Sequence, residues 1–265
     1  MDETLDGQHT GRYRLDQLYR AEKIYLGTKF QIVLAAVLGL KEGAQLDFSI
    51  AGHDVDMVFT QGANWAIPPE ALGHVCVLVQ LDERRSDWSI GLLTVDEQLL
   101  QGARNRGGMQ SLSRAGREAV RWLFRKAPLP DNTLHGLAAE DVAAIMSYRR
   151  ASERVGQLLR TAQHRRIGPS AVATVAMQPD SLKRLRDLRP ILAREGIATF
   201  SRLHAESARA LGLPAPEGHE VVTARLASLG EDEPEAPYIE LEGRRWALAR
   251  PGDPVEPVPA LRSGP

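Results

Sequence analysis

The sequence predicts an α/β protein in two parts: a mixed sheet flanked by helices, then a C-terminal winged-helix or helix-turn-helix domain. Three observations lead to this prediction. Apolar and polar residues alternate through 46–60, 74–81 and 87–95, which is typical of β-strands. Further along the chain, leucines recur at helical spacing. Lysine and arginine are concentrated in the same region, as expected of a part that contacts nucleic acid.

Composition limits the class of protein. The chain has 265 residues, 43% of them hydrophobic and 25% charged, which suffices for one large domain or two smaller ones. Its one cysteine, Cys76, lies in an apolar run, so we expect a buried thiol and a reducing compartment. The sequence has no signal-peptide pattern and no apolar run of membrane-spanning length. We therefore expect a soluble cytoplasmic protein with no membrane partner.

Two acids frame a predicted β-hairpin. The strands meet at a turn at Ala51-Gly52, and Asp47 and Asp56 lie on either side of it, nine positions apart. Val58 shares a strand face with Asp56. The alternate positions of the second strand predict a core: Val55, Met57 and Phe59. Taken alone, two such aspartates are more often solvated turn or edge residues than metal ligands.

The spacing of these acids also matches part of a nuclease motif. In metal-dependent nucleases with the pattern P-D…(D/E)-x-K, two acids hold Mg²⁺ and a lysine two residues past the second acid helps to stabilise the attacking water. Asp47 and Asp56 supply two acids, but Val58 occupies the lysine position. A hydrocarbon side chain neither donates a proton nor stabilises negative charge.

The second half of the chain has the charge and pattern of a DNA-binding module. Residues 149–209 hold 13 Lys/Arg and five Asp/Glu, a net charge of +8. We predict helices at Ser152–Ala162, Ser170–Ala176 and about Ser181–Arg194, with a turn at Pro179-Asp180. Two short helices joined by a tight turn, the second of them basic, are typical of a helix-turn-helix. A solvated helix face is the alternative explanation of the charge.

The third predicted helix carries the candidate DNA contacts. Leucines on one of its faces predict packing against the core, and basic residues lie largely on the other. Arginine binds guanine edges or phosphates, and lysine binds phosphates. The candidate DNA-binding residues are Gln178, Ser181, Lys183, Arg184, Arg186 and Arg189.

Segments along nearly the whole chain, in order, resemble the NaeI type II restriction endonuclease family. The similarity is far more specific than the short nuclease motif. The segments include Thr4–Tyr13, Ile67–Glu70, Trp88–Leu92, Ala173–Gln178 and Gly243–Pro254.

This resemblance implies a restriction-endonuclease-like fold and a homodimer. It also implies an N-terminal Mg²⁺-dependent endonuclease domain and a C-terminal helix-turn-helix domain, both of which bind double-stranded DNA. The family's two metal aspartates fall on Asp47 and Asp56. Its catalytic lysine falls on Val58 and its upstream glutamate on Gln31, so both positions have lost a charge.

We therefore predict a nuclease-like domain over 1–148, a helix-turn-helix domain over 149–250 and a proline-rich, extended or disordered tail over 251–265. The first domain includes a helix expected over Ser113–Arg125, and the second includes late strands expected over Val221–Leu226 and Tyr238–Leu248. The predicted protein is a bacterial, nucleoid-associated DNA-binding homodimer. It has lost cleavage, requires no cofactor, retains a vestigial Mg²⁺ site, and acts as a transcriptional regulator or site-bridging factor. The alternative is an Mg²⁺-dependent endonuclease that cuts or nicks a palindromic site with a displaced lysine, for which Lys29 is the first candidate. A third reading is a dimerisation partner of an active paralogue.

Overall fold

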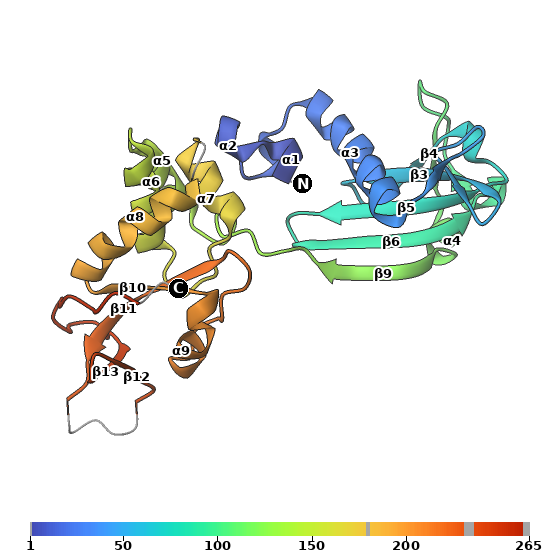
Figure 1. The fold of residues 1–265 in the computed structure, drawn as a ribbon. Helices are drawn as coiled ribbons and strands as arrows, with labels where there is room; N and C mark the ends of the chain where they lie inside the picture. The colour runs from blue at the N-terminus through green and yellow to red at the C-terminus, as the bar shows by residue number, and fades with distance from the viewer. Residues whose placement is uncertain (1, 179–180, 231–235, 262–265) are drawn as a thin grey trace. The chain divides into compact units, whose positions relative to one another are not determined.

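The computed structural model describes residues 2–178, 181–230 and 236–261, with only the backbone of Ser181 and Leu182 (Figure 1). The chain forms two compact units. Unit one comprises Leu18–Pro130, and unit two comprises Asp2–Gln17 together with Asp131–Pro265. The functional limits 1–148, 149–250 and 251–265 stay a prediction.

A six-stranded sheet forms the centre of unit one, in the order β1-β2-β3-β5-β6-β9. Its strands β3 and β5 are parallel and the other neighbours are antiparallel, so the sheet is mixed, as the sequence predicts. The strands are β1 (Lys41–Glu42), β2 (Phe48–Ile50), β3 (His53–Thr60), β5 (Val75–Asp82), β6 (Asp87–Thr94) and β9 (Arg121–Pro128).

Each face of this sheet packs against a different layer. Helix α3 (Arg20–Leu38) lies along one face, where its Phe30 and Leu34 contact the cluster that includes Val55 and Met57 (Figure 1). The buried Val55 and Met57 confirm the predicted core face of the hairpin. The other face carries Cys76, Leu78 and Trp65. A small sheet and short helices complete unit one: β4 (Ala66–Ile67), β8 (Gln110–Leu112), β7 (Leu100–Gln101), η2 (Pro69–Ala71), η3 (Glu97–Leu99) and α4 (Arg114–Glu118).

The predicted hairpin turn is confirmed and one predicted helix is wrong. Ala51 and Gly52 both have positive φ, as a two-residue turn between β2 and β3 requires. The helix expected over Ser113–Arg125 covers only Arg114–Glu118, and strand β9 follows. The run Val120–Phe124 is rich in β-branched and aromatic residues, and it pairs with the open edge of β6.

Unit two combines a helical cluster with an antiparallel sheet. The helices expected over 152–162, 170–176 and 181–194 are confirmed as α6, α7 and α8. The helices of unit two are α1 (Asp2–Leu5), α2 (Gly7–Thr10), η1 (Leu15–Gln17), α5 (Ala139–Ser147), α6 (Ala151–Thr161), α7 (Pro169–Ala176), α8 (Ser181–Arg194), η4 (Arg202–His204) and α9 (Ala205–Ala210).

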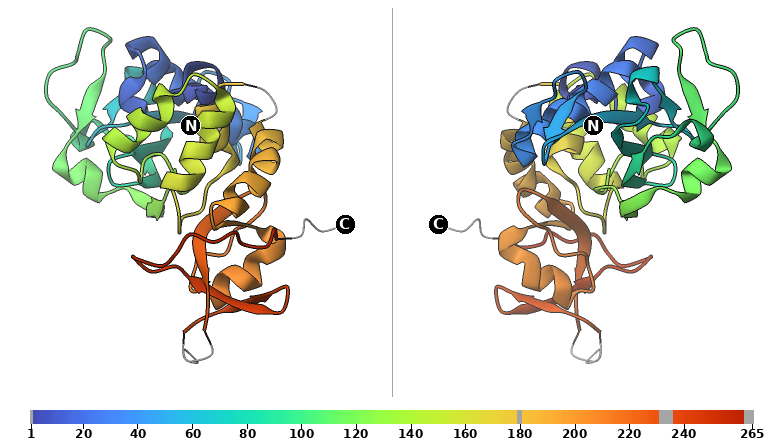
Figure 2. Two further views of the ribbon diagram at one scale, coloured as in Figure 1. Left: turned by 90° about the vertical axis from the view of Figure 1, so that its left-hand side faces the viewer. Right: turned by 90° about the vertical axis from the view of Figure 1, so that its right-hand side faces the viewer.

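The sheet of unit two is curled and four-stranded (Figure 2). Its order is β10 (Ile197–Ser201), β11 (Val221–Ser228), β13 (Arg244–Leu248) and β12 (Ile239–Leu241). The single strand expected over Tyr238–Leu248 is therefore a hairpin, because Glu242 and Gly243 adopt positive φ and reverse the chain. The part of unit two that the structure describes forms no clear winged helix.

The described part of the proline-rich tail has no regular secondary structure but is packed onto unit two. Val258 is buried in the cluster around Phe200 and Trp246, and its N–H donates to the carbonyl of Ala193. The Glu256 carboxylate accepts a hydrogen bond from the backbone N–H of Ser228 at 2.6 Å. These contacts hold the described tail in place, and its character as a separate extended or disordered region stays a prediction.

Candidate functional site

The predicted hairpin brings Asp47 and Asp56 together. Phe48 of β2 pairs with Val55 of β3, so the residues just beyond, Asp47 and Asp56, face each other across the hairpin. The Asp47 carboxylate accepts a hydrogen bond from the backbone N–H of Met57 at 2.9 Å. The structure thus places the two predicted metal ligands side by side.

Burial and like charge make Asp56 unusual. Its side chain is only 8% exposed, and its buried Oδ2 atom has no hydrogen-bond partner. Loss of solvation, followed by repulsion from Asp47, raises the pKa of Asp56 from 3.8 to about 6. A buried carboxylate oxygen without a partner, next to a second carboxylate, favours either a shared proton or a cation.

Cys76 lies on β5 in register with Asp56 and is fully buried. Burial, with smaller contributions from Asp56 and Asp47, raises the pKa of its thiol to about 12. The thiol therefore stays protonated and unreactive at neutral pH, in agreement with the prediction of a buried thiol.

Gln31 and Asp47 both line a cavity of about 370 Å³, which lies between α3 and the start of the hairpin. The cavity is also lined by Lys41 and Glu42 of β1, two charged residues that the sequence analysis did not select. Lys29 is not among its lining residues. A two-residue strand carries no alternation pattern, so nothing in the sequence indicated that Lys41 lies near Asp47.

Val58 faces an apolar cluster. It pairs in register with Leu78 of β5 and packs against the cluster that contains Trp65 and Leu93. The position that the family resemblance assigns to a catalytic lysine is therefore a half-buried hydrocarbon in apolar surroundings.

The residues present partly fit a divalent cation. Mg²⁺ prefers oxygen ligands, and Asp47 and Asp56 supply them, whereas Gln31 lines a cavity with Asp47 but not with Asp56. The unpartnered Oδ2 of Asp56 is a ready donor atom. However, the described residues include no group of three or more His, Cys, Asp or Glu side chains that could hold a metal ion. Asp47 and Asp56 would hold Mg²⁺, which when bound polarises a phosphate, and Gln31 would add no charge.

Asp56→Asn is expected to stabilise the protein against urea at pH 8 and to leave its stability nearly unchanged at pH 3. In the unfolded chain the carboxyl ionises near 3.8, but in the fold it ionises near 6. Its ionisation therefore opposes folding fully above pH 6, whereas below 3.8 the group is protonated in both states. We expect a gain on the order of 2 kcal/mol at pH 8, measured with EDTA present. An equal change at both pH values would contradict this account.

On helix α8, some of the predicted DNA-binding side chains are exposed to solvent, and others are half-buried. Lys183 and Arg186 are exposed. Arg184 is half-buried, and its guanidinium donates to the side-chain oxygen of Gln178. Arg189 is also half-buried, and its pKa is lowered by desolvation and then by the charge of Arg186. The side chain of Ser181 lies outside the described residues.

The core-facing side of α8 is as predicted. Leu185 and Leu188 are buried against α6 and α7, whereas the side chain of Leu182 is outside the described part. This packing orients the basic side of the helix outward at Lys183 and Arg186.

A mixed sheet with paired acids on a β-hairpin, in a chain with a basic helical segment over 149–209, has the features expected of a restriction-endonuclease-like protein. The chain matches the family model described as restriction endonuclease NaeI over residues 1–257. It is 36% identical to the type II restriction enzyme NaeI of Lentzea aerocolonigenes over 275 aligned residues, which cover 98% of this chain and 86% of the relative. The chain therefore belongs to the NaeI restriction endonuclease family.

Within the part of the chain that the structure describes, no helix is both long and apolar enough to span a membrane.

Proposed function

We propose that this protein is a homodimeric, site-specific double-stranded DNA-binding protein that has lost efficient cleavage. The observation that carries the proposal is Val58, which packs into an apolar cluster where the family resemblance expects a catalytic lysine. Removing one positioned catalytic group commonly reduces the rate by about 10²–10⁴-fold, and groups that act together are not additive. Gln31 removes a second charge from the same site. The protein then serves as a transcriptional regulator or as a factor that bridges two DNA sites.

Helices α7 and α8 support DNA binding through a helix-turn-helix. The two helices pack against each other and against α6 in one core, and the exposed Lys183 and Arg186 lie on the second of them. In a helix-turn-helix the second helix enters the major groove, where arginine binds guanine or phosphate. The hydrogen bond from Arg184 to Gln178 holds these two side chains together, so they would act as one unit toward DNA.

Helix α3 supports the homodimer. Phe30 and Leu34 pack on the sheet, yet several other apolar side chains of the helix are exposed to solvent. Exposed apolar patches of this kind mark interfaces. The exposed apolar residues are Ile24, Tyr25, Ile32, Val33, Val37 and Leu38. We propose that a second copy of the chain covers them, in the cytoplasm of a bacterial cell.

Lys183→Gln and Arg186→Gln are each expected to weaken duplex binding and to reduce the slope of log K against log salt by about 1, because each removes one phosphate-neutralising charge. Titrations of a labelled duplex at several salt concentrations measure both quantities. Arg209→Gln on α9 is the matched control, since Arg209 is exposed on a different helix. Unchanged affinity and slope in both α8 variants would refute the assignment of α8 as the recognition helix.

A second candidate function is Mg²⁺-dependent cleavage, and two observations favour it. The relative that covers almost the whole chain is named a type II restriction enzyme. Lys41 lines the same cavity as Gln31 and Asp47, so a lysine from β1 could take the place of the one missing at Val58. This candidate requires metal-dependent cutting that Asp56→Ala abolishes and Lys41→Gln slows by about 10²-fold or more.

A further inference from the structure

Unit one contains a second cavity, of about 480 Å³, on the sheet face that also carries Asp56. Gln80 lines it, and Gln80 pairs with Thr60, four positions along the strand from the Cys76–Asp56 pair. At about 3.3 Å per residue this separation is roughly 13 Å. Leu78 and Trp65 fill the space between the two sites. The cavity is thus distinct from the carboxylate pair.

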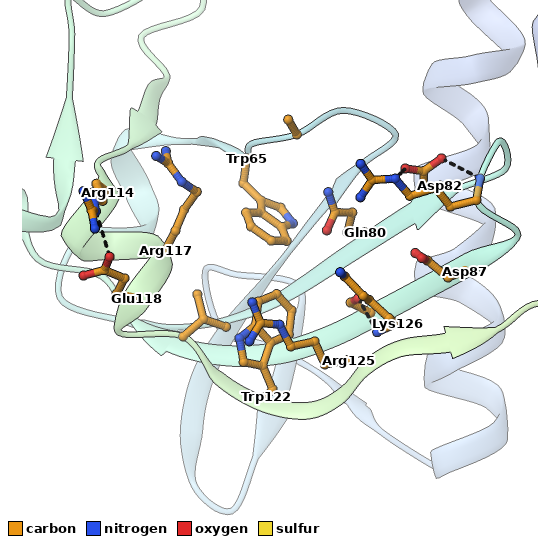
Figure 3. Close-up of a pocket in the computed structure, with 14 residues that line it drawn as sticks. Trp65, Gln80, Asp82, Asp87, Arg114, Arg117, Glu118, Trp122, Arg125 and Lys126 are labelled. Atoms are coloured by element: carbon orange, nitrogen blue, oxygen red, sulfur yellow. Dashed lines mark hydrogen bonds and ion pairs between the residues drawn. The ribbon is translucent and has the colours of Figure 1, made fainter.

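Five basic residues and two tryptophans line this cavity, together with the acids Asp82, Asp87 and Glu118 (Figure 3). Arg85 is paired with Asp82 at 3.6 Å, and Arg114 is paired with Glu118 at 2.9 Å. The three other basic residues of the cavity form no ion pair with a carboxylate among the described residues. They are Arg117, Arg125 and Lys126.

A β-bulge directs two adjacent cations into the cavity. Ile90 pairs with Phe124 and Trp88 pairs with Ala127, so Arg125 and Lys126 together lie opposite the single residue Ser89. The hydroxyl of Ser89 accepts a hydrogen bond from the Lys126 N–H at 2.9 Å, and Lys126 adopts a φ of 53°. In a regular strand these neighbours would point to opposite faces. Bulges of this kind often re-aim side chains at functional sites, and a lysine in the left-handed region is strained.

Trp122 orients one of these cations. The guanidinium of Arg125 stacks on the Trp122 ring, 5.3 Å from its centroid, and Trp122 in turn contacts Trp65 at 6.0 Å between centroids. A guanidinium stacked on a ring keeps its N–H edge free, and that edge matches two oxygens of a phosphate. Arg117 is also held in place, since it donates to the carbonyl of Leu112 at 2.9 Å.

We propose that this cavity binds a nucleotide through its phosphate. Arg125, Lys126 and Arg117 neutralise the phosphate, while Trp122 and the side chains of Gln80 and Asp87 contact the remainder of the nucleotide. Its volume falls in the range of small-ligand sites. The phosphate belongs either to a free nucleotide or to the backbone of DNA bound by unit one. Neither helix α8 nor the pair Asp47 and Asp56 takes part. A free-nucleotide site goes beyond the proposed function, whereas a backbone-phosphate site rests on it.

The test compares the full-length protein with the double variant Arg125→Gln/Lys126→Gln, with Arg84→Gln as the control. Arg84 is exposed in the neighbouring β5–β6 turn and does not line the cavity. One arm titrates deoxyadenosine monophosphate and, separately, inorganic phosphate by calorimetry. The other arm titrates a duplex at several salt concentrations.

The double variant is expected to bind at least one of these ligands 10-fold or more weakly, while Arg84→Gln binds as the unmodified protein does. A loss confined to the mononucleotide assigns a free-nucleotide site, and a loss confined to the duplex, with a salt slope lower by about 2, assigns a backbone phosphate. No loss for any ligand would overturn the proposal. The mononucleotide arm remains informative if the protein binds no duplex, so failure of the proposed function is seen separately.

Lys126→Gly separates binding from folding. Glycine accepts the positive φ of position 126 without strain, so this variant is expected to melt at the same temperature or higher and yet to bind the ligand more weakly. A variant that is more stable and binds as well as the unmodified protein would show that the lysine serves no ligand.

Discussion

The double variant Gln31→Glu/Val58→Lys is expected to cut its DNA site in Mg²⁺ at least about 10²-fold faster than the unmodified protein. The two carboxylates are already adjacent, since the hairpin register sets Asp47 opposite Asp56. What the site lacks is charge. Glutamate at 31 restores a negative ligand for the metal, and lysine at 58 restores a cation beside the attacking water. Val58 is only partly buried, so the stem of a lysine can follow the apolar cluster while its amine reaches the carboxylates.

Time courses of duplex cleavage at fixed Mg²⁺ measure this effect. Each single variant serves as a comparison, and adding Asp56→Ala to the double variant is expected to abolish any gain. A double variant that is folded and binds DNA but does not cut would contradict the assignment of lost cleavage to positions 31 and 58.

Arg154→Met is expected to lower the free energy of unfolding by about 3–5 kcal/mol. Arg154 is only 9% exposed, and its guanidinium donates to four backbone carbonyls. Two of these end α7, at Val175 and Ala176. The other two follow α5, at Tyr148 and Arg149. A cation at the ends of two helices satisfies their free carbonyls and opposes their dipoles.

Methionine fills most of the arginine volume but leaves the carbonyls of Val175 and Ala176 buried without these donors. Urea unfolding followed by circular dichroism measures the loss. Arg149→Met is the matched control and is expected to change stability by less than about 0.5 kcal/mol, because its exposed side chain forms no interaction among the described residues. If both variants lost the same small amount of stability, the buried guanidinium would not hold the helix ends.

The parts of the fold that the sequence predicted correctly are those that short, local residue patterns encode. The turn at Ala51-Gly52 and the helices α6, α7 and α8 follow from turn residues, capping residues and leucine spacing. The helix expected over Ser113–Arg125 failed because its second half is held as a strand by pairing with β6. That pairing joins distant segments, and no local pattern encodes it.

The candidate site likewise has a part that the sequence predicts and a part that it does not. Asp47 and Asp56 could be placed together because a hairpin fixes their register. Lys41 could not be placed near Asp47 from the sequence, because its strand is two residues long. The sequence could not predict the basic cavity either, because a bulge at Arg125 and Lys126 reverses the expected orientation of one side chain.

Selection of bound duplexes from a random library, followed by incubation of the selected duplex with Mg²⁺, tests most directly whether this protein binds DNA without cutting it. A twofold dimer is expected to select a palindromic sequence. Our account predicts a defined palindromic site that stays intact in Mg²⁺ and in an EDTA control alike. Cleavage at that site in Mg²⁺, abolished by Asp56→Ala, would contradict the account and would identify a working restriction endonuclease.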